Sequence, residues 1–384
     1  MKLVRVIFLL PAAALIMWAV RLLAKRGVLV RFGTFWHSRL GHMIGNTECY
    51  LCERDAGLQP KAFDIWFPDP AKDANPVISG KYRNLLHVWP AWLARPVFAV
   101  NGLDPRWQKH IVVTKQVDRD TLGLWEKHAP HIGFTEREER RGNSLLRSLG
   151  IPSGALFACL MVRDGSYLAR RFPKADFSYH DYRDADISDY IPTAVELIRR
   201  GYYVVRMGAI VGKPLLAKHS MIIDYPARGR TAFGDLYLGA KCAFCVGTPA
   251  GFTAIPAVFN RPLALTDCVP LEYALTWGRG VMTWKHHEKE GRRLGVREIC
   301  SSGLGLATFS QLFEQQRVKL VNNSAQEIYE CAMECAIRTE TGDWGGETQD
   351  AFWDNFPTSM VNGSSVNGVK RIRIGAEFLK GYAQ

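Results

Sequence analysis

The chain has 384 residues, more than one ordinary hydrophobic core needs, and this length suits two domains. Lys and Arg number 49 against 37 Asp and Glu, so the formal net charge of +12 favours anionic partners such as phosphorylated ligands and acidic lipid headgroups. The apolar and charged fractions exclude a mainly disordered chain, and no aromatic-plus-basic repeat is typical of a nucleic-acid module, so we expect no nucleic-acid partner.

The N-terminal run Val6–Val20 (VIFLLPAAALIMWAV) carries no charge and is flanked by basic residues on both sides. At a rise of about 1.5 Å per residue it covers about 22 Å, less than the roughly 30 Å of a bilayer core, and long basic side chains can extend to the headgroups. We predict a membrane-anchor helix at residues 1–26, with a buried core helix as the alternative. The basic residues after it predict that the main body lies on the cytoplasmic face of the inner membrane, anchored or peripheral.

The first half alternates strands with helices, which predicts a parallel α/β domain at residues 27–145. A loop at residues 33–46 leads into a helix through Cys52. The polar stretch 135–144 lacks apolar periodicity, and we predict an interdomain linker near it. Strands are predicted at Val28–Phe32, Ala62–Phe67 and Ile111–Thr114.

The second half gives a clearer pattern. The continuous apolar run Leu156–Val162 is typical of a parallel strand covered on both faces. Apolar residues recur at helical spacing from Ile191 to Ile198, and Gly201 ends that helix. We predict a second, doubly wound Rossmann-like domain at 146–355 and a C-terminal tail and helix at 356–384. Further strands are predicted at Tyr202–Val205, Met221–Ile223, Cys242–Val246 and Leu263–Leu265.

Charged residues and a glycine turn directly follow these strands. The carboxyl ends of parallel strands meet at one edge of a sheet, where open α/β folds bind ligands. The pattern therefore predicts a site for an anionic, hydroxyl-bearing ligand. The residues are Arg163, Asp164, Arg206, Asp224, Gly247, Thr248 and Asp267.

The segment 241–262 contains both a C-x-x-C pair, Cys242 and Cys245, and a GTPAG turn. On a strand the two thiols would point to opposite faces, so they could not share a metal or form a disulfide. Cys49 and Cys52 share a helical face, but a four-thiolate zinc site needs two good pairs. We therefore predict core cysteines and no metal.

The turn after these cysteines is the functional candidate. Gly247 and Gly251 allow the backbone to approach a ligand, and a helix starting near Thr253 would offer unpaired N–H groups. The alternative is an ordinary strand–turn–helix corner. The long polar insertion at 163–191 also favours function, whereas its Asp184-x-Asp186 pair is predicted to start a helix rather than bind a metal.

Several motifs carry a resemblance to a known family. The chain resembles a bacterial family of proteins assigned as glycosyltransferases, which looks like a distant relative of the fucosyltransferase superfamily with the GT-B fold. The resemblance covers most of the chain after residue 28. The motifs are 39–46 (RLGHMIGN), 162–164 (VRD) with Tyr167, 178–183 (SYHDYR), 204–208 (VVRMG), 223–225 (IDY), 235–251 (DLYLGAKCAFCVGTPAG) and 373–379 (RIGAEFL).

This resemblance implies an α/β, GT-B-like architecture in which two Rossmann-like domains face a cleft, with the donor on the C-terminal domain and the acceptor on the N-terminal one. Arg163 matches the arginine that grips the donor diphosphate. Met161 stands where the family has a histidine, and Pro249 and Ala250 replace its usual serines. The resemblance implies Asp235, Thr248 and Gly251 as further donor-binding residues, and the strand-end pattern adds Arg206, Asp224 and Gly247.

The remaining site residues are a general base and a loop that contacts the acceptor or lines the cleft. A base must accept the proton of the acceptor hydroxyl. Asp164 is expected because it adjoins Arg163, with His42 and Glu48 as rivals. The implied loop residues are Arg39, Gly41, Asn46, Tyr167, His180, Tyr182 and Arg183.

The expected function is therefore transfer of a sugar from a nucleotide-diphosphate sugar, with GDP as one candidate nucleotide, to a cell-surface glycan precursor. The acceptor would be a glycan or a lipid-linked glycan at the membrane surface. Arginines and backbone donors can stabilise the departing diphosphate, so no metal or other cofactor is expected. The alternatives are a nucleotide-sugar epimerase or hydrolase of the same fold, and a non-catalytic, membrane-tethered protein that binds nucleotides or glycans.

Overall fold

The structure is a computed structural model that describes residues 2–114, 118–171, 173–174, 176–217, 219–345, 348–357, 359–361 and 364–382. The chain forms two compact units. The first comprises residues 1–118 and 130–132, and the second comprises residues 119–129 and 133–384. The predicted boundary at residue 145 differs from this division, because residues 133–145 belong to the second unit.

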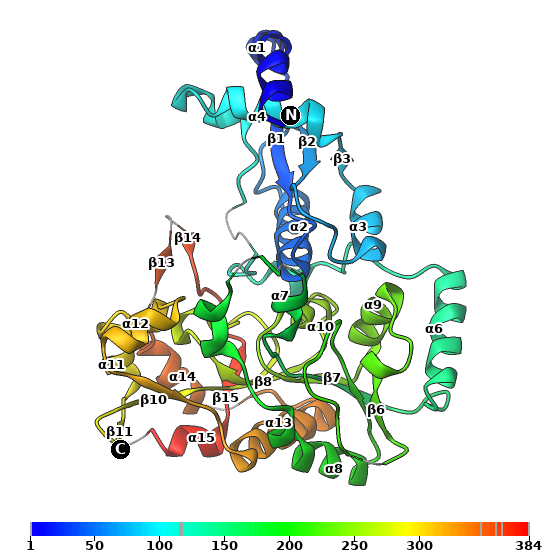
Figure 1. Cartoon of the computed structure of the whole chain (residues 1–384), viewed down its shortest axis with the longest axis vertical. Coiled ribbons are helices and arrows are strands. Elements are labelled where there is room, and N and C mark those ends of the chain that lie inside the picture. The colour runs from blue at the N-terminus through cyan, green and yellow to red at the C-terminus, as the bar shows by residue number, and fades with distance from the viewer. Residues whose placement is uncertain are drawn as a thin grey trace. The chain divides into compact units, whose positions relative to one another are not determined.

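The first unit is built on a small parallel sheet with strand order β1-β2-β3 (Figure 1). The predicted strand at 111–114 is reduced to one bridge between Ile111 and Phe32. The strands are β1 (Val30–Phe35), β2 (Phe63–Pro68) and β3 (His87–Val88). The helices are α1 (Lys2–Lys25), α2 (Leu40–Asp55), α3 (Pro76–Arg83), α4 (Ala91–Asn101) and the 3₁₀ helix η1 (Pro105–His110).

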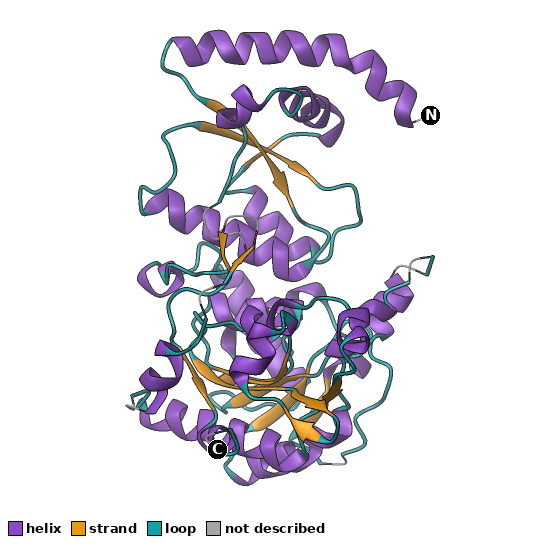
Figure 2. Ribbon diagram, turned by 90° about the vertical axis from the view of Figure 1, so that its left-hand side faces the viewer, coloured by secondary structure: helices purple, strands orange, loops and turns teal. Residues whose placement is uncertain are grey.

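Helix α1 is longer than the apolar run that predicted it, and Figure 2 shows its full length. Ala13, Met17 and Val20 recur at helical spacing and are buried against α4 and β1. Leu15 and Trp18 lie on the exposed side. Among the residues whose side chains are described, no helix is long and apolar enough to cross a membrane.

The second unit contains a seven-stranded sheet with the order β15-β9-β8-β7-β4-β5-β6, in which every pair is parallel (Figure 2). From β4 the chain adds strands outward on one side, then returns to place β7 on the other side of β4. This is the doubly wound order, and its switch point lies between β4 and β7. The strands are β4 (Phe157–Met161), β5 (Tyr203–Arg206), β6 (Ile222–Asp224), β7 (Phe244–Gly247), β8 (Leu263–Cys268), β9 (Gly280–Trp284) and β15 (Ile372–Ile374).

Helices cover both faces of this sheet. On one face α8 (Ile191–Arg199) and α13 (Ala325–Thr341) bury side chains against alternate residues of the strands, such as Leu160 and Val246. The other face meets α9 (Ala232–Lys241), where the Cys159 thiol lies 3.6 Å from the carbonyl oxygen of Leu238. The doubly wound domain predicted for the second half is therefore confirmed.

Figure 1 labels many of the remaining elements of the second unit, most of which are short. The helices are α5 (Leu124–Lys127), α6 (Glu136–Ser148), α7 (Ser166–Arg171), α10 (Ala254–Val258), α11 (Val296–Ser301), α12 (Ser310–Gln315), α14 (Thr348–Asp354) and α15 (Ala376–Lys380). The 3₁₀ helices are η2 (Ser178–Arg183), η3 (Ile187–Tyr190), η4 (Tyr225–Ala227), η5 (Gly251–Thr253), η6 (Leu271–Tyr273) and η7 (Leu304–Leu306). The minor strands are β10 (His286–Lys289), β11 (Arg292–Arg293), β12 (Lys319–Val321), β13 (Met360–Val361) and β14 (Ser364–Ser365).

Two organisational predictions are wrong. The polar stretch 135–144, near which the linker was predicted, begins a helix of the second unit, because Thr135 and Glu138 form a capping box that starts α6, and Glu139 binds Tyr237 of α9. The C-terminal segment is not a tail, because β15 forms an edge strand of the large sheet and α15 packs on α13.

The predicted loop at 33–46 is also corrected. Strand β1 runs to Phe35, and α2 begins at Leu40 after Arg39, which serves as its N-cap residue in an extended conformation. Gly41 and Asn46 are therefore helical. Glycine in a helix gave a loop signal, but the buried face of α2 outweighs that local preference.

The prediction that Cys242 and Cys245 both lie on a strand is wrong. Cys242 does not lie in a strand but is the C-cap residue of α9, so strand alternation does not separate it from Cys245. Cys159, Cys242 and Cys245 are all buried, and all nine cysteines are thiols rather than disulfides. Eight of the nine are buried, as the prediction of core cysteines required, and Cys300 is partly exposed.

Candidate functional site

The switch point of the large sheet is held by a close contact between β4 and β7. Gly247 pairs with Met161 and has a φ of +144°, and a Cβ at this position would lie 1.8 Å from the Met161 carbonyl oxygen. The next residue, Thr248, donates its N–H to the same carbonyl at 2.9 Å. Its hydroxyl accepts the backbone N–H of Arg163 at 2.9 Å. The turn therefore fixes where Arg163 leaves β4.

The Arg163 guanidinium lies over this edge of the sheet. Its Nη1 donates to Asp184 Oδ1 at 2.6 Å and to the His180 carbonyl oxygen at 3.0 Å. Burial raises the pKa of Asp184, although Arg163 acts in the opposite direction. The polar insertion after β4 thus folds back on the switch point, as its length suggested.

Two more cations join Arg163 here. Lys285 is only 3% exposed, and its Nζ donates to the Asp184 carbonyl oxygen at 2.7 Å. Arg183 donates to the Pro249 carbonyl oxygen at 3.2 Å. Burial lowers the pKa of both Lys285 and Arg183, so bringing an anion to them would relieve an unfavourable environment. Asp184 and Asp267 are the nearby acidic partners.

Lys285 was not among the predicted residues, although the sequence carries a signal for it. It directly follows β9, in the same position relative to its strand as the charged residues that were selected. The run 280–284 (GVMTW) was not recognised as a strand, so its following residue was not considered.

The aromatic residues of the insertion line the same region. His180 contacts Tyr182, with ring centroids 6.2 Å apart, and Tyr182 packs on Phe313. Tyr167 lies on α7 under the guanidinium of Arg171. These partly exposed rings could contact a sugar or a base. Gly251, at the exposed start of η5, follows the Thr248 turn.

Arg206 is the last residue of β5, and Asp224 is the last residue of β6. These two side chains form an ion pair with each other, and Asp224 is not the partner of Arg163. Arg206 Nη1 lies 3.3 Å from Asp224 Oδ1, and Asp224 also accepts the backbone N–H of Leu215. Arg206 is fully buried, so this pair primarily joins the two strands. An open pocket of about 430 Å³ lies beside Asp224.

Asp235, one of the residues predicted to bind the donor, lies in the first turn of α9. Both of its carboxylate oxygens accept hydrogen bonds from the Arg230 guanidinium. Burial raises its pKa to about 6, against the influence of Arg230. The Asp235 carboxyl is therefore mostly ionised only above about pH 6, a higher pH than an ordinary carboxylic acid needs.

This raised pKa makes the stability of the second unit depend on pH. Above its unfolded pKa near 3.8 the folded form of Asp235 binds more protons, so its contribution is complete below that pH and is lost as the pH rises through about 6. Asparagine does not titrate, so we expect the Asp235→Asn protein not to lose this contribution to stability as the pH rises. The free energy of unfolding of the variant minus that of the wild type should rise by about 2 to 3 kcal/mol between pH 4 and pH 7.

Urea unfolding of both proteins at several pH values measures this difference. Other carboxyl groups, including Asp120 with its raised pKa, titrate in both proteins and cancel. A difference that stays constant with pH would contradict the prediction.

The three predicted bases lie in different settings. Both oxygens of Asp164 accept backbone N–H groups, from Ser166 at 2.9 Å and Gly212 at 3.0 Å. His42 lies in the first turn of α2, with a ring that is 40% exposed and Nδ1 2.8 Å from Asp118 Oδ2. Gly45, one turn on, allows the Asp118 backbone to approach α2 closely.

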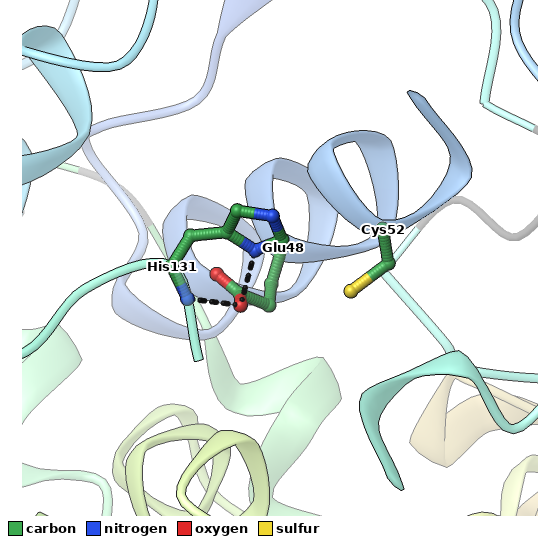
Figure 3. A group of neighbouring side chains, drawn as sticks. All are labelled: Glu48, Cys52 and His131. Atoms are coloured by element: carbon green, nitrogen blue, oxygen red, sulfur yellow. Dashed lines mark hydrogen bonds and ion pairs between the residues drawn. The ribbon is translucent and has the colours of Figure 1, made fainter. Parts of the chain in front are cut away.

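Glu48 belongs to a buried group that the sequence did not reveal. Its Oε1 accepts both the backbone N–H and Nδ1 of His131, each at 2.8 Å, while Cys52 lies on the next turn of α2 (Figure 3). The ligand-type atoms of Glu48, Cys52 and His131 lie within 4.8 Å of one another. His131 comes from a segment 83 residues away, so no local pattern could predict the contact.

The first unit contains a second cluster of titratable side chains that was not predicted from the sequence. It lies where β1 and β2 end, with His37 Nε2 3.1 Å from the Asp69 carbonyl oxygen and the Ser38 N–H bound to Asp69 Oδ1. Asp73 lies 3.6 Å from the other ring nitrogen. His37 and Ser38 follow β1 and were predicted to lie in a loop. Their partner Asp69 follows β2 and was not predicted to be near them.

No family model matches the sequence, and no curated protein matches it. Among solved structures, the chain is similar to E. coli ADP-heptose LPS heptosyltransferase II, with a TM-score of 0.36 and 15% identity over 61% of this chain and 83% of that one. It is similar to a family 9 glycosyl transferase from Veillonella parvula, with a TM-score of 0.46 and 11% identity over 82% and 98%.

A third similar structure is the iron-containing dodecameric glycosyltransferase TibC from enterotoxigenic E. coli, with a TM-score of 0.38 and 11% identity over 82% of this chain and 77% of that one. All three structural neighbours are glycosyltransferases, and none is a fucosyltransferase. These scores are too low to assign an activity. Chemically, the switch point brings three cations together at a sheet edge, an arrangement suited to phosphate groups.

Proposed function

We propose that the protein is a glycosyltransferase that uses a nucleotide-diphosphate sugar, and that the second unit binds the diphosphate. The observation that carries this proposal is the convergence of Arg163, Arg183 and Lys285 at the switch point of a doubly wound sheet. A diphosphate would supply negative charge to these three cations, in addition to that of the neighbouring carboxylates Asp184 and Asp267. The family resemblance of the sequence supports the same donor class.

In the proposed reaction the acceptor hydroxyl oxygen attacks the anomeric carbon, the bond from that carbon to the phosphate oxygen breaks, and the nucleoside diphosphate leaves with the electron pair. Arg163 can hold two phosphate oxygens with its planar fork, and Lys285 supplies a point charge. The Gly247–Thr248 turn keeps Arg163 at the strand end. These groups stabilise the developing charge, so we propose that the transfer step needs no metal.

The hydroxyl proton needs a base, and we propose His42 rather than Asp164 or Glu48. Asp164 already accepts two backbone donors, and Glu48 is buried in hydrogen bonds with His131 and Tyr82. His42 is accessible, and Asp118 orients its ring through Nδ1. A histidine held by a carboxylate is a common arrangement for proton transfer.

Calorimetric titration of the protein with GDP, UDP, CDP, ADP and dTDP tests the donor site, first with a chelator and then with Mg²⁺. We expect one nucleotide to bind without metal, which would also identify the donor nucleotide. Absence of binding by all five under both conditions would refute the donor-site assignment.

A binding protein without turnover is the second candidate, because Met161 stands where the resembling family has a histidine and Asp164 is occupied. Incubating the protein and the matching nucleotide sugar with a glycan-lipid extract separates the candidates. Release of the nucleoside diphosphate only with acceptor supports the transferase, whereas release without acceptor indicates a hydrolase, and sugar isomerisation indicates an epimerase. Intact binding without any release favours the binding protein.

We also propose that α1 places the protein on the cytoplasmic face of the inner membrane, near a lipid-linked glycan acceptor. Its exposed side presents Leu15 and Trp18, and exposed Lys25 and Arg26 follow at its end. An apolar face bordered by basic residues suits an anionic lipid surface.

Trp18→Glu should lower the fraction bound to phosphatidylglycerol vesicles several-fold, because it puts a charge on the apolar face. Leu216→Glu is the matched control, since Leu216 is exposed on the second unit. Co-sedimentation measures both variants, and equal binding by wild type and Trp18→Glu would exclude α1 as the contact surface.

A further inference from the structure

Helix α2 and the short segment 130–132 bring three metal-ligand types together inside the first unit. Glu48 and Cys52 are four residues apart, so both side chains leave the same face of the helix, and each is only 1% exposed. His131, with a side chain that is 12% exposed, meets them from the other segment (Figure 3). From this geometry we propose that Glu48, Cys52 and His131 form a zinc-binding site.

The three donor atoms suit zinc in both chemistry and spacing. A carboxylate oxygen, a thiolate and an imidazole nitrogen are its usual protein ligands, and three of them leave a fourth position for water. In a zinc tetrahedron such atoms are roughly 3.3 to 3.8 Å apart. Here they lie within 4.8 Å, and Glu48 and His131 are 2.8 Å apart. Side-chain shifts of about 1 Å would therefore admit the ion.

The partners around these ligands support the assignment independently. Metal-binding histidines donate their second ring N–H to a carboxylate, and metal-binding carboxylates are themselves hydrogen-bonded. His131 presents Nδ1 to Glu48, and its Nε2 lies 2.9 Å from Asp55 Oδ2. The second oxygen of Glu48 accepts the Tyr82 hydroxyl at 3.0 Å. Both ligands are thus already oriented as a metal would need them.

The position of the site also indicates what the ion would do. The chain leaves the first unit after residue 118, returns for residues 130–132 and leaves again. Zinc would fasten this short return segment to α2 through His131. It would take the place of the proton that now bridges Glu48 and His131, and the Cys52 thiol would release its proton on binding. The ion would connect two segments of the first unit, whereas the residues proposed to hold the diphosphate belong to the second unit.

The competing interpretation is a metal-free site in which His131 is simply protonated. Burial alone would lower its pKa, but hydrogen bonds and charge from Glu48 and Asp55 raise it above the ordinary value. This arrangement would bind no metal at one equivalent, so titration with metal distinguishes the two.

The full chain, purified with a chelator and then freed of it, should be titrated with Co²⁺ and with Zn²⁺ as competitor. We expect one equivalent of Co²⁺ to produce thiolate-to-cobalt charge-transfer absorption together with intense visible bands of a tetrahedral site, and Zn²⁺ to abolish both. Cys52→Ser should remove the charge-transfer band and weaken binding at least about 100-fold, more than loss of an outer hydrogen-bond partner.

Cys49→Ala is the matched control, because Cys49 is equally buried on α2 but is outside the group. It should keep the band. His131→Gln should weaken Co²⁺ binding while keeping the thiolate band at high metal concentration. A wild-type protein without the band at one equivalent, or a Cys52→Ser protein that retains it, would overturn the proposal. Since the wild-type spectrum alone can refute the site, the test does not depend on the folding of any variant.

Discussion

Replacing Arg163 by alanine should weaken nucleoside-diphosphate binding by about 10- to 100-fold while the second unit stays folded. A hydrogen bond between charged groups contributes about 1.5 to 3 kcal/mol, which corresponds to this range. The fold should survive because the backbone N–H of residue 163, not its side chain, binds Thr248. Asp184 would keep its nearby cation Lys285. Calorimetry with the nucleotide found to bind the wild type measures the change.

Two further variants show whether the effect belongs to the guanidinium. Arg163→Lys keeps the charge but not the planar fork, and it should bind with intermediate affinity. Arg170→Ala removes an exposed charge on α7 and should leave the affinity within about twofold, because exposed charges are screened by solvent and salt. A folded Arg163→Ala protein with unchanged affinity would move the diphosphate site elsewhere.

The edge of the large sheet could be predicted because parallel strands make a simple geometric rule. Once Leu156–Val162 was recognised as a buried strand, the residues after each strand had to meet at one edge. Arg163, Thr248 and Gly247 do meet there. Apolar runs along the sequence supplied this information, without any knowledge of side-chain contacts.

The geometry of parallel strands predicts which residues lie at one edge of the sheet, but it does not predict which of them form ion pairs with each other. Arg206 and Arg163 looked equivalent in sequence, yet Arg206 is buried against Asp224, while Arg163 turns toward the insertion. Which partner an arginine finds depends on how the insertion folds over the sheet. The sequence of 163–191 has no periodicity from which that path could be predicted.

The first unit was less predictable because its important contacts are long-range. Glu48 and His131 are brought together by a chain path that leaves the unit and returns. The Cys49/Cys52 pair drew attention because it is local, whereas the group that suits a metal uses only one of these thiols. Short-range spacing therefore drew attention to Cys49 and Cys52, which we expected to be core residues, and could not reveal that His131 meets Glu48 and Cys52.

Gly247→Ala should cost more than about 4 kcal/mol of unfolding free energy and prevent stable folding of the second unit. Two effects add at this position. The φ of +144° is strained for alanine by about 1 to 3 kcal/mol. The added Cβ would also lie 1.8 Å from the Met161 carbonyl oxygen, which is held in the pairing of β4 with β7. Backbone atoms of two central strands cannot move apart without breaking the sheet.

Gly201→Ala separates these two effects. Gly201 also has a positive φ, of +87°, but a Cβ there meets no atom of the described chain within 4 Å. Its substitution should therefore cost only about 1 to 2 kcal/mol. Urea unfolding, or the soluble yield where unfolding is complete, measures both variants. If Gly247→Ala were no less stable than Gly201→Ala, the close approach of β4 and β7 would not exist, and the Thr248 turn that positions Arg163 would lose its structural basis.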